Sequence, residues 1–561
     1  MQRRSFLKTA AMGSLAWCAG PATDRLSAAA GVAASQGGSS EAGIEILPGE
    51  AIGVIRPDIY GHFVEHLGAV VYDGIWVGEQ SKVPNIGGLR KALVEALRAV
   101  RPGVIRWPGG CFADSYNWRD GIGPRSQRPR RGSFWADDSA WPPGCPDGPW
   151  KYETNEFGTN EFVRFCRLVG AQPYFAANVR SLSPKDFYEW IDYCNAPAGA
   201  TTLAASRAAT GDRDPLGVRN WGVGNESWGC GGNFRPEEYA AEYRRFIEWV
   251  PRFGQNLTFI ASGPNGGDLE WTRRFFAAMR ERRSLGSVAG WALHHYSWNV
   301  SGGRTQDWSK GKGAAVGYPV SEWFELLNEA NRMETLIADH WAAMGEADPQ
   351  HRVKLVVDEW GAWYKPGSQV DPTHLFGQQS TMRDAVLAGL TLDTFNRHVD
   401  KVMMANVAQL VNTLHALFLA HEDQFLVTPT YHVFAMHQAH QGGRAVRSVF
   451  TAPPASYAEN GRSVALPGLA GSASLHDRRL VLTVTNPDPQ QAREAAITVR
   501  DAKPGGVRVT TLVAGSIQTV NTFDRPDAIR PVEKTLAATP GGRLTHTFPA
   551  ASVTKLEMDL T

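Results

Sequence analysis

Lys354-Leu355-Val356-Val357-Asp358 is a short apolar run that ends in a carboxylate, and runs of this kind decide the fold. Its length suits a strand better than a helix, and its paired valines favour extended backbone. Seven similar runs occur between residues 59 and 410, and stretches with apolar residues three or four positions apart lie between them. The sequence therefore predicts strand and helix in alternation, eight times each, up to about residue 440.

The spacing Leu89, Leu93, Leu97 and Val100 is one of the helical patterns. Eight strand and helix units predict a (β/α)8 TIM barrel over residues 56–440. A doubly wound open sheet is the alternative, but the first run contains Tyr60-Gly61-His62-Phe63 and no Gly-rich phosphate turn follows it. The eight expected strands are Ile59–Glu65, Gly103–Pro108, Pro173–Val179, Arg219–Gly224, Leu257–Ser262, Gly290–Tyr296, Lys354–Asp358 and Met403–Leu410.

The pattern changes after residue 440 to alternating apolar and polar residues separated by turns rich in Pro, Gly and Asn. Arg479–Val484, Ala495–Val499 and Ser552–Met558 are examples, and they predict an all-β sandwich, jelly-roll-like, over residues 441–561. Residues 43–55 contain the strand-like Gly43–Leu47, which we expect to join that sandwich. We interpret residues 132–148 as an insertion above the barrel mouth.

The N-terminus carries Arg3-Arg4-Ser5-Phe6-Leu7-Lys8 before a short apolar stretch, which resembles a twin-arginine export signal. We therefore expect residues 1–34 to be a signal peptide, residues 35–42 a flexible lead, and the mature protein to be periplasmic or secreted. The apolar stretch is too short for a membrane span, and no later segment supplies about 20 uninterrupted apolar residues.

The charge balance excludes some partners. With 57 basic and 56 acidic residues, the chain lacks the positive field that attracts nucleic acid or an anionic membrane. The 19 Trp residues suit sugar stacking as well as core packing. Beyond the expected signal, five cysteines remain, an odd number that implies no disulfide framework, although a single disulfide is left open.

Two expected strands end beside a glutamate. Asn225-Glu226 follow the fourth strand, and Asp358-Glu359 follow the seventh. Barrel enzymes place catalytic groups at the C-terminal ends of strands, so these side chains can converge across the barrel mouth. A glycosidase needs one carboxyl to protonate the leaving oxygen and one to attack the anomeric carbon. Pairing with arginine or capping a loop is the structural alternative, but two matched sites favour the chemical reading.

The motifs resemble glycoside hydrolase family 51, the α-L-arabinofuranosidases. The resemblance extends from about Ile44 through the sandwich and depends on Tyr60–Gly68, Ile105–Phe112, Tyr116–Pro124, Gly224–Glu226 and Asp358–Trp360. It implies a retaining enzyme that releases terminal non-reducing α-L-arabinofuranosyl residues. Glu226 is then the acid/base and Glu359 the nucleophile.

The resemblance also implies a set of sugar-binding residues. Asn225 would bind the sugar 2-hydroxyl, and Tyr296 would donate to Glu359. Arg106 would bind the sugar and orient Glu359, although salt-bridge scaffolding is the alternative for Arg106 and Glu65. Cys111 stands where some members have Asn, and its pairing with Cys230 is left open. The full expected set is Glu65, Arg106, Cys111, Trp150, Asn225, Tyr296 and Gln409, with Trp150 as an aromatic wall.

The expected partners are arabinose-containing plant oligosaccharides or polysaccharides such as arabinan or arabinoxylan, and the resemblance implies a homo-oligomer, possibly a hexamer. No cofactor or metal is expected, because adjacent His294 and His295 point to opposite faces of a strand. The alternatives are an endo-β-glucanase or β-xylosidase on the same scaffold, and a non-catalytic carbohydrate-binding protein. The basic run Arg125, Arg128, Arg130 and Arg131 is expected to be a solvated or structurally paired loop, and a role in binding an anionic substrate is the alternative.

Overall fold

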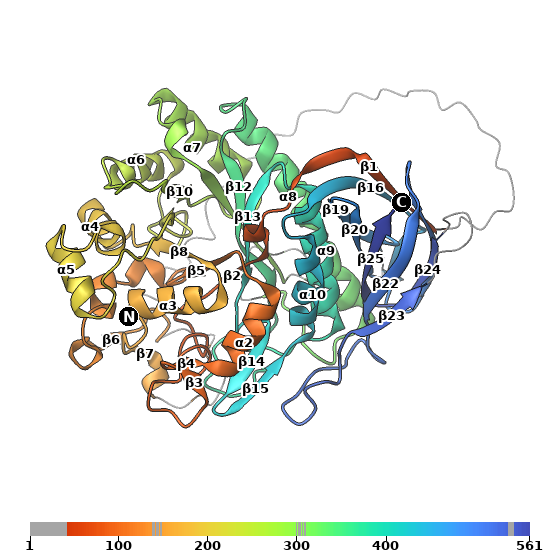
Figure 1. Ribbon diagram of the computed structural model, residues 1–561, viewed down its shortest axis with the longest axis horizontal. Coiled ribbons are helices and arrows are strands. Elements are labelled where there is room, and N and C mark those ends of the chain that lie inside the picture. Colours follow the sequence, from red (N-terminus) through yellow and green to blue (C-terminus); the bar gives the residue numbers. More distant parts are fainter. Residues whose placement is uncertain are drawn as a thin grey trace, which may run out of the picture.

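The computed structural model describes residues 42–561 apart from 137–140, 142–144, 146–147, 299, 301–304, 306, 308–309, 460 and 537–543. The expected signal peptide, nearly all of the expected lead and much of the 132–148 insertion lie outside these described residues. The chain forms a barrel beside a curved C-terminal sheet (Figure 1). No helix in the described ranges is both long and apolar enough to cross a membrane.

Eight parallel strands close into a barrel in the order β10-β11-β12-β13-β2-β5-β8-β9. Closure confirms the predicted barrel and rules out the open sheet. In chain order the barrel strands are β2 (Gly61–Phe63), β5 (Val104–Trp107), β8 (Gln172–Ala177), β9 (Asn220–Val223), β10 (Thr258–Ala261), β11 (Gly290–Ser297), β12 (Lys354–Ala362) and β13 (Val402–Ala408).

Helices surround the barrel because each buries one apolar face against the strands. In α2, for example, Leu93, Val94, Leu97 and Val100 are buried. The α-helices are α2 (Lys91–Val100), α3 (Thr159–Val169), α4 (Pro184–Asn195), α5 (Thr202–Ala209), α6 (Pro236–Ile247), α7 (Leu269–Glu281), α8 (Val320–Gly345), α9 (Met382–Arg397) and α10 (Pro429–His437). Short paired strands decorate the loops: β3 (Asn85–Ile86) with β4 (Leu89–Arg90), β6 (Arg131–Gly132) with β7 (Tyr152–Glu153), β14 (Phe418–His421) with β15 (Gln424–Val427), and β17 (Ala455–Glu459) with β18 (Arg462–Leu466).

Two strand limits differ from the sequence prediction. The first strand was expected from Ile59, but Pro57–Tyr60 form a 3-10 helix, and the Tyr60 hydroxyl donates to Asn396 Oδ1 at 2.8 Å. The seventh strand was expected to stop at Asp358, but β12 continues to Ala362. Glu359 therefore lies within a strand and not in the loop after it.

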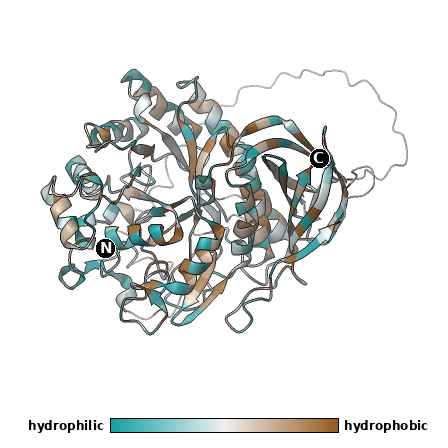
Figure 2. Ribbon diagram, viewed as in Figure 1, coloured by the Kyte–Doolittle hydropathy of each residue, from teal (hydrophilic) through white to brown (hydrophobic). Residues whose placement is uncertain are grey.

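The C-terminal part is a sheet in the order β23-β22-β25-β20-β19-β16-β1-β21-β24. Its inward residues, among them Ile44, Leu482, Phe548 and Leu556, share one apolar core, so the two halves of the curved sheet pack against each other as a sandwich. Hydrophobic and hydrophilic residues alternate along these strands (Figure 2). Its strands are β1 (Ala42–Val54), β16 (Arg444–Thr451), β19 (Ala470–His476), β20 (Arg479–Asn486), β21 (Arg493–Val499), β22 (Pro504–Leu512), β23 (Val532–Leu536), β24 (Leu544–Phe548) and β25 (Ser552–Leu560).

β1 joins the N-terminal end of the described chain to this sandwich. It pairs antiparallel with β16 and parallel with β21. Helix α9 contributes the main polar contacts between barrel and sandwich: buried Asp393 accepts from Ser472 Oγ at 2.6 Å and Thr483 Oγ1 at 2.5 Å. The sandwich is therefore fastened to the barrel by hydrogen bonds as well as by apolar packing.

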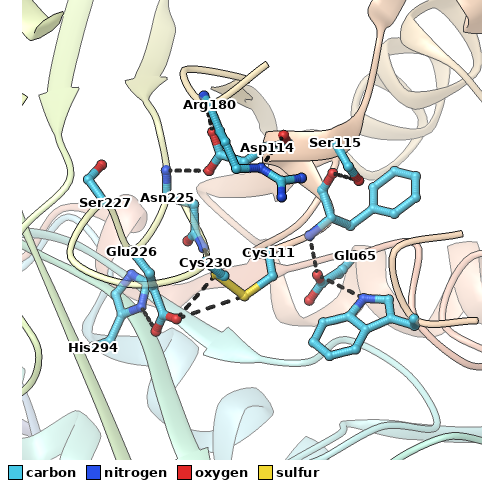
Figure 3. Close-up of a disulfide and its surroundings, with 12 residues drawn as sticks. Glu65, Cys111, Asp114, Ser115, Arg180, Asn225, Glu226, Ser227, Cys230 and His294 are labelled. Atoms are coloured by element: carbon cyan, nitrogen blue, oxygen red, sulfur yellow. Dashed lines mark hydrogen bonds and ion pairs between the residues drawn. A yellow bond between two sulfur atoms is a disulfide. The ribbon is translucent and has the colours of Figure 1, made fainter. Parts of the chain in front are cut away.

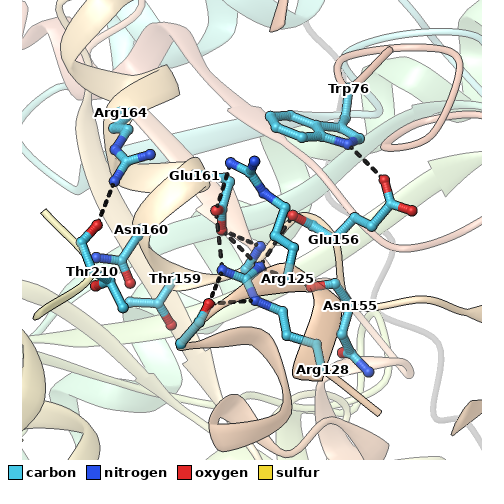
Figure 4. A network of polar contacts seen from close by, with 12 residues as sticks. Trp76, Arg125, Arg128, Asn155, Glu156, Thr159, Asn160, Glu161, Arg164 and Thr210 are labelled. Atoms are coloured by element: carbon cyan, nitrogen blue, oxygen red, sulfur yellow. Dashed lines mark hydrogen bonds and ion pairs between the residues drawn. The ribbon is translucent and has the colours of Figure 1, made fainter. Parts of the chain in front are cut away.

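The basic run after Ile122 is paired within the fold, as expected. Arg128 donates to Glu161 on α3 and to the carbonyl of Asn155, and Arg125 also contacts Glu161 (Figure 4). Arg131 forms an ion pair with Asp120 at 2.9 Å. Arg125 and Arg128 therefore fix the loop to the barrel through Glu161.

Candidate active site

Two carboxyls meet at the C-terminal mouth of the barrel. Glu226 follows β9, and Glu359 lies in β12. One carboxylate oxygen of each lies within 4.8 Å of the other, and both face His294 on β11. His294 Nδ1 is 3.0 Å from Glu226 Oε1 and 3.5 Å from Glu359 Oε2. The structure therefore brings together the two glutamates that the sequence placed on separate strands.

A bulge in β12 gives this strand two consecutive inward carboxylates. Val357 pairs with Leu293 and Glu359 with His294, so Asp358 is an extra residue in the register. In a regular strand neighbours point to opposite faces, but a bulge re-aims one of them. Asp358 accepts from Tyr174 at 2.8 Å and from Asn406 at 3.1 Å inside the barrel. Glu359 is thereby free to face the mouth.

Arg106 at the end of β5 holds Glu359 in place. Its Nη1 donates to Glu359 Oε1 at 2.8 Å, and its Nη2 donates to Asn225 Oδ1 at 2.6 Å. The Tyr296 hydroxyl donates to Glu359 Oε2 at 2.8 Å. Burial alone would raise the pKa of Glu359, but the charges of His294 and Arg106 and these hydrogen bonds lower it. Glu359 is thus held ionised, as a nucleophile requires.

The turn that carries Glu226 is fixed by Asp114. Asn225 N donates to Asp114 Oδ2 at 3.1 Å (Figure 3). Val179 N donates to Asp114 Oδ1 at 2.8 Å. Glu226 itself has φ of 39°, a left-handed conformation that costs non-Gly residues of order 1 kcal/mol and persists where the surroundings enforce it. This turn places the Glu226 carboxyl over the mouth.

Cys111 and Cys230 form a disulfide beside Glu226 (Figure 3). The sulfur atoms lie 3.9 Å and 3.6 Å from Glu226 Oε2. The pairing that the sequence left open is thus present, and Cys111 has no thiol hydrogen to offer a sugar. As a sugar ligand, Cys111 could therefore contact the sugar only through its disulfide sulfur.

Glu65 and Gln409 form a second polar pair at the mouth. Glu65 Oε1 accepts from Phe112 N at 3.0 Å and from Trp135 Nε1 at 3.3 Å, and Gln409 Nε2 donates to Oε2 at 3.1 Å. Burial and the nearby charge of Glu359 raise the pKa of Glu65 to about 7, although the hydrogen bonds from Phe112 and Gln409 lower it. The carboxyl is therefore poised between its two protonation states near neutral pH.

Sequence reasoning missed three residues at this site. His294 shares a strand face with Tyr296, because residues two apart point the same way, and that periodicity was the available signal. Asp114 lies in the short 3-10 helix Ala113–Ser115 and Trp135 in a turn, and neither segment is long enough for a side-chain period to indicate direction. Trp150, the expected aromatic wall, has no hydrogen bond to the site residues in the described part of the chain, and its role stays a prediction.

A closed parallel barrel with two carboxyls so close at its mouth defines a glycoside hydrolase. Two family models match, Alpha-L-arabinofuranosidase 1 domain over residues 96–313 and Alpha-L-arabinofuranosidase C-terminal domain over residues 358–552. The GH51 arabinofuranosidase structure from Xanthomonas axonopodis pv. citri superimposes with a TM-score of 0.83 and 35% identity, covering 92% of this chain and 100% of that one.

Two curated relatives agree. An intracellular exo-α-L-arabinofuranosidase of Bacteroides ovatus is 34% identical over 90% of this chain and 93% of its own. An intracellular exo-α-(1→5)-L-arabinofuranosidase of Bifidobacterium longum is 26% identical over 90% and 89%. The chain belongs to glycoside hydrolase family 51, the α-L-arabinofuranosidases. The glucanase, xylosidase and binding-protein alternatives are not favoured.

The predicted location is corrected by the same relatives. Both are named intracellular enzymes, which contradicts the expected periplasmic or secreted site. The expectation depended on Arg3-Arg4 and a short apolar stretch. A targeting signal is a short sequence that a receptor recognises. The folded part of the chain therefore gives no support for the predicted export.

Proposed function

We propose that the chain releases terminal α-L-arabinofuranosyl residues by double displacement, with Glu359 as nucleophile and Glu226 as acid/base. One observation carries this proposal: an oxygen of each carboxyl lies within 4.8 Å of the other. Retaining enzymes keep their carboxyls about 5–5.5 Å apart, whereas inverting enzymes leave about 6.5–9.5 Å for a water molecule. The separation here supports direct attack by a carboxylate.

In the first step, a Glu359 oxygen bonds to the anomeric carbon as the glycosidic bond breaks. The Glu226 carboxyl gives its proton to the departing oxygen. In the second step, Glu226 takes a proton from water, and the resulting hydroxide displaces Glu359 from the anomeric carbon. Two inversions restore the starting configuration. Arg106 and Tyr296 support this sequence, since both donate hydrogen bonds to the nucleophile.

Sugar recognition follows from the polar groups around the carboxyls. Asn225, whose Oδ1 accepts from Arg106, would bind the 2-hydroxyl, and Glu65 and Gln409, which are hydrogen-bonded to each other, would supply further hydroxyl partners. Trp135 lies against Glu65 and adds an aromatic face. Arabinan, arabinoxylan and related oligosaccharides are the proposed substrates, and the exo-acting names of both curated relatives support removal of terminal units. A homo-oligomer is proposed from the resemblance alone.

Glu226→Ala and Glu359→Ala test the roles. Glu226→Ala should slow poor leaving groups far more than activated aryl arabinofuranosides, and azide should restore turnover by replacing the water that lost its base. Glu359→Ala should abolish turnover of every substrate. Glu346→Ala, on the exposed surface beside Arg273, is the matched control and should keep full activity.

NMR of the first-formed sugar decides the stereochemistry. Retained configuration with azide rescue limited to Glu226→Ala is the expected result. Inverted product, or rescue of Glu359→Ala alone, would reverse the proposal.

A further inference from the structure

Three segments that are far apart in the sequence bring Asp73, His374 and His421 together outside the carboxyl site. Asp73 lies in the loop after β2, His374 in the loop between β12 and α9, and His421 ends β14, which follows β13. One ligand-capable atom from each lies within 4.8 Å of the other two. All three segments leave the C-terminal ends of barrel strands, so the cluster lies on the same side of the barrel as the active site.

The distances within the cluster exceed those of good hydrogen bonds. His421 Nδ1 is 3.3 Å and His374 Nε2 is 3.8 Å from Asp73 Oδ2. Tetrahedral ligands about 2.0–2.1 Å from one zinc-like ion lie about 3.3–3.4 Å from each other. His421 Nδ1 is also shielded from solvent without a hydrogen-bond partner in the described chain. The spacing therefore suits a shared cation better than direct pairing.

Outer contacts orient the ligand atoms. Asp73 Oδ1 is 3.2 Å from Arg90 Nη2, and Glu422 N lies 3.0 Å from Oδ1 and 3.2 Å from Oδ2. Asp371 Oδ2 is 3.7 Å from His421 Nε2, the ring nitrogen that faces away from Asp73. This distance is longer than a hydrogen bond, and a small side-chain movement on metal binding would let Asp371 accept from that nitrogen, as the outer carboxylate of a metal-bound histidine does.

Asp371 is itself held, because its Oδ1 accepts from Thr373 N at 2.8 Å and from Thr373 Oγ1 at 2.6 Å. Charge also favours a cation. Asp73 and Asp371 are two carboxylates beside the histidines, and Arg90 Nη2 lies 3.2 Å from Asp73 Oδ1.

We propose that Asp73, His374 and His421 bind one divalent transition-metal ion of the zinc type, with Asp371 as the outer partner of His421. Two imidazoles and one carboxylate favour such an ion over Ca2+ or Mg2+, which prefer oxygen ligands. The ion is structural, since no hydrogen bond or ion pair of these residues in the described chain reaches Glu226 or Glu359.

Binding would tie three loops of the barrel mouth to one another. His374 precedes Leu375 and Phe376, and the Phe376 ring packs against Trp135 at 5.8 Å and Trp363 at 5.2 Å. Trp135 donates to Glu65, and Trp363 packs on Tyr296. The ion would therefore stiffen the aromatic rim around the sugar pocket.

Full-length protein stripped with EDTA and titrated with ZnCl2 by calorimetry tests the site. One zinc per chain should bind, with a rise in melting temperature, and Ca2+ and Mg2+ should bind much more weakly. Asp371→Asn should lower zinc affinity 10–100-fold, and half-exposed His421→Ala should abolish binding at this site. His476→Gln is the matched control, because within the described residues the hydrogen bond of its imidazole is to the Ala439 carbonyl at 3.0 Å, and it should bind zinc like the native chain.

Circular dichroism establishes that His421→Ala and Asp371→Asn are folded before titration. Zinc binding should also weaken in acid, because metal ligation requires deprotonated ligands. Equal zinc stoichiometry and affinity in the native chain and in both variants would overturn the proposal, as would the absence of zinc binding to the native chain.

Discussion

His294 Nδ1 lies between the two carboxyls, 3.0 Å from Glu226 Oε1 and 3.5 Å from Glu359 Oε2. Burial alone would lower the pKa of His294, but the two glutamates raise it. A histidine that is positively charged in this position favours the ionised form of Glu359. The acid limb of the pH profile of kcat/KM therefore depends on His294, which in the proposed mechanism neither attacks the anomeric carbon nor protonates the leaving group.

His294→Gln should shift the acid limb of kcat/KM to higher pH. The neutral side chain no longer lowers the pKa of Glu359, so the nucleophile becomes protonated at a less acid pH. A pH profile on an aryl arabinofuranoside measures the shift. His295→Gln is the control, since His295 Nε2 faces the Glu329 carbonyl instead. An unchanged acid limb in His294→Gln would contradict the prediction.

Arg106→Lys should lower kcat by roughly 10²-fold, the order of loss that follows a misplaced reacting group. Lysine keeps the charge but cannot donate to Glu359 and Asn225 at once in the planar geometry of a guanidinium. Steady-state kinetics with melting temperature as a fold control separates this effect from unfolding. Full activity in Arg106→Lys would mean that charge alone positions Glu359.

Glu65→Gln should change how stability depends on pH. The pKa of Glu65 is raised from 4.5 to about 7 in the fold, so its contribution is fully present below about pH 4.5 and is lost as pH rises through 7. Gln cannot ionise, so the free energy of unfolding of the variant should lack this part of the fall between pH 4.5 and 7. Urea unfolding between pH 4.5 and 8 tests it, and parallel curves for both proteins would refute it.

The double change Cys111→Ser and Cys230→Ser should lower both stability and rate. The disulfide joins residues 119 apart in sequence, and removing such a cross-link typically costs about 2–4 kcal/mol. Its sulfur atoms also contact Glu226, so kcat should fall. Reducing agent should reproduce both effects in the native chain and neither in the variant, and equal sensitivity of the two proteins would count against the prediction.

Asp393→Ala should loosen the sandwich from the barrel. Asp393 is fully buried and accepts from Ser472 and Thr483, with His437 Nε2 at 3.2 Å. Removing the carboxylate leaves these buried donors without their acceptor, which costs about 1–3 kcal/mol for each. Asp559→Ala, near the exposed end of β25, is the control. Denaturant unfolding measures the difference, and a loss no larger than that of the control would show that apolar packing alone holds the domains.

The sequence by itself determined the eight strands and the two glutamates. Apolar runs such as Lys354–Asp358 and helical spacing such as Leu89 to Val100 are local patterns. They can be recognised from the period of the apolar residues in the sequence alone. A strand-end position then placed Glu226 and Glu359 at one mouth, because parallel strands in a barrel share a C-terminal face. The sandwich followed from alternation in the same way.

Only the tertiary structure decided which side chains touch. The bulge at Asp358 depends on pairing with Leu293 and His294 on a neighbouring strand, and the Cys111–Cys230 bond depends on the meeting of two segments 119 residues apart in sequence. Asp73, His374 and His421 likewise come from three distant loops. Local periodicity carries no information about register between strands or about the direction of a loop, because both are set by contacts between residues far apart in the chain.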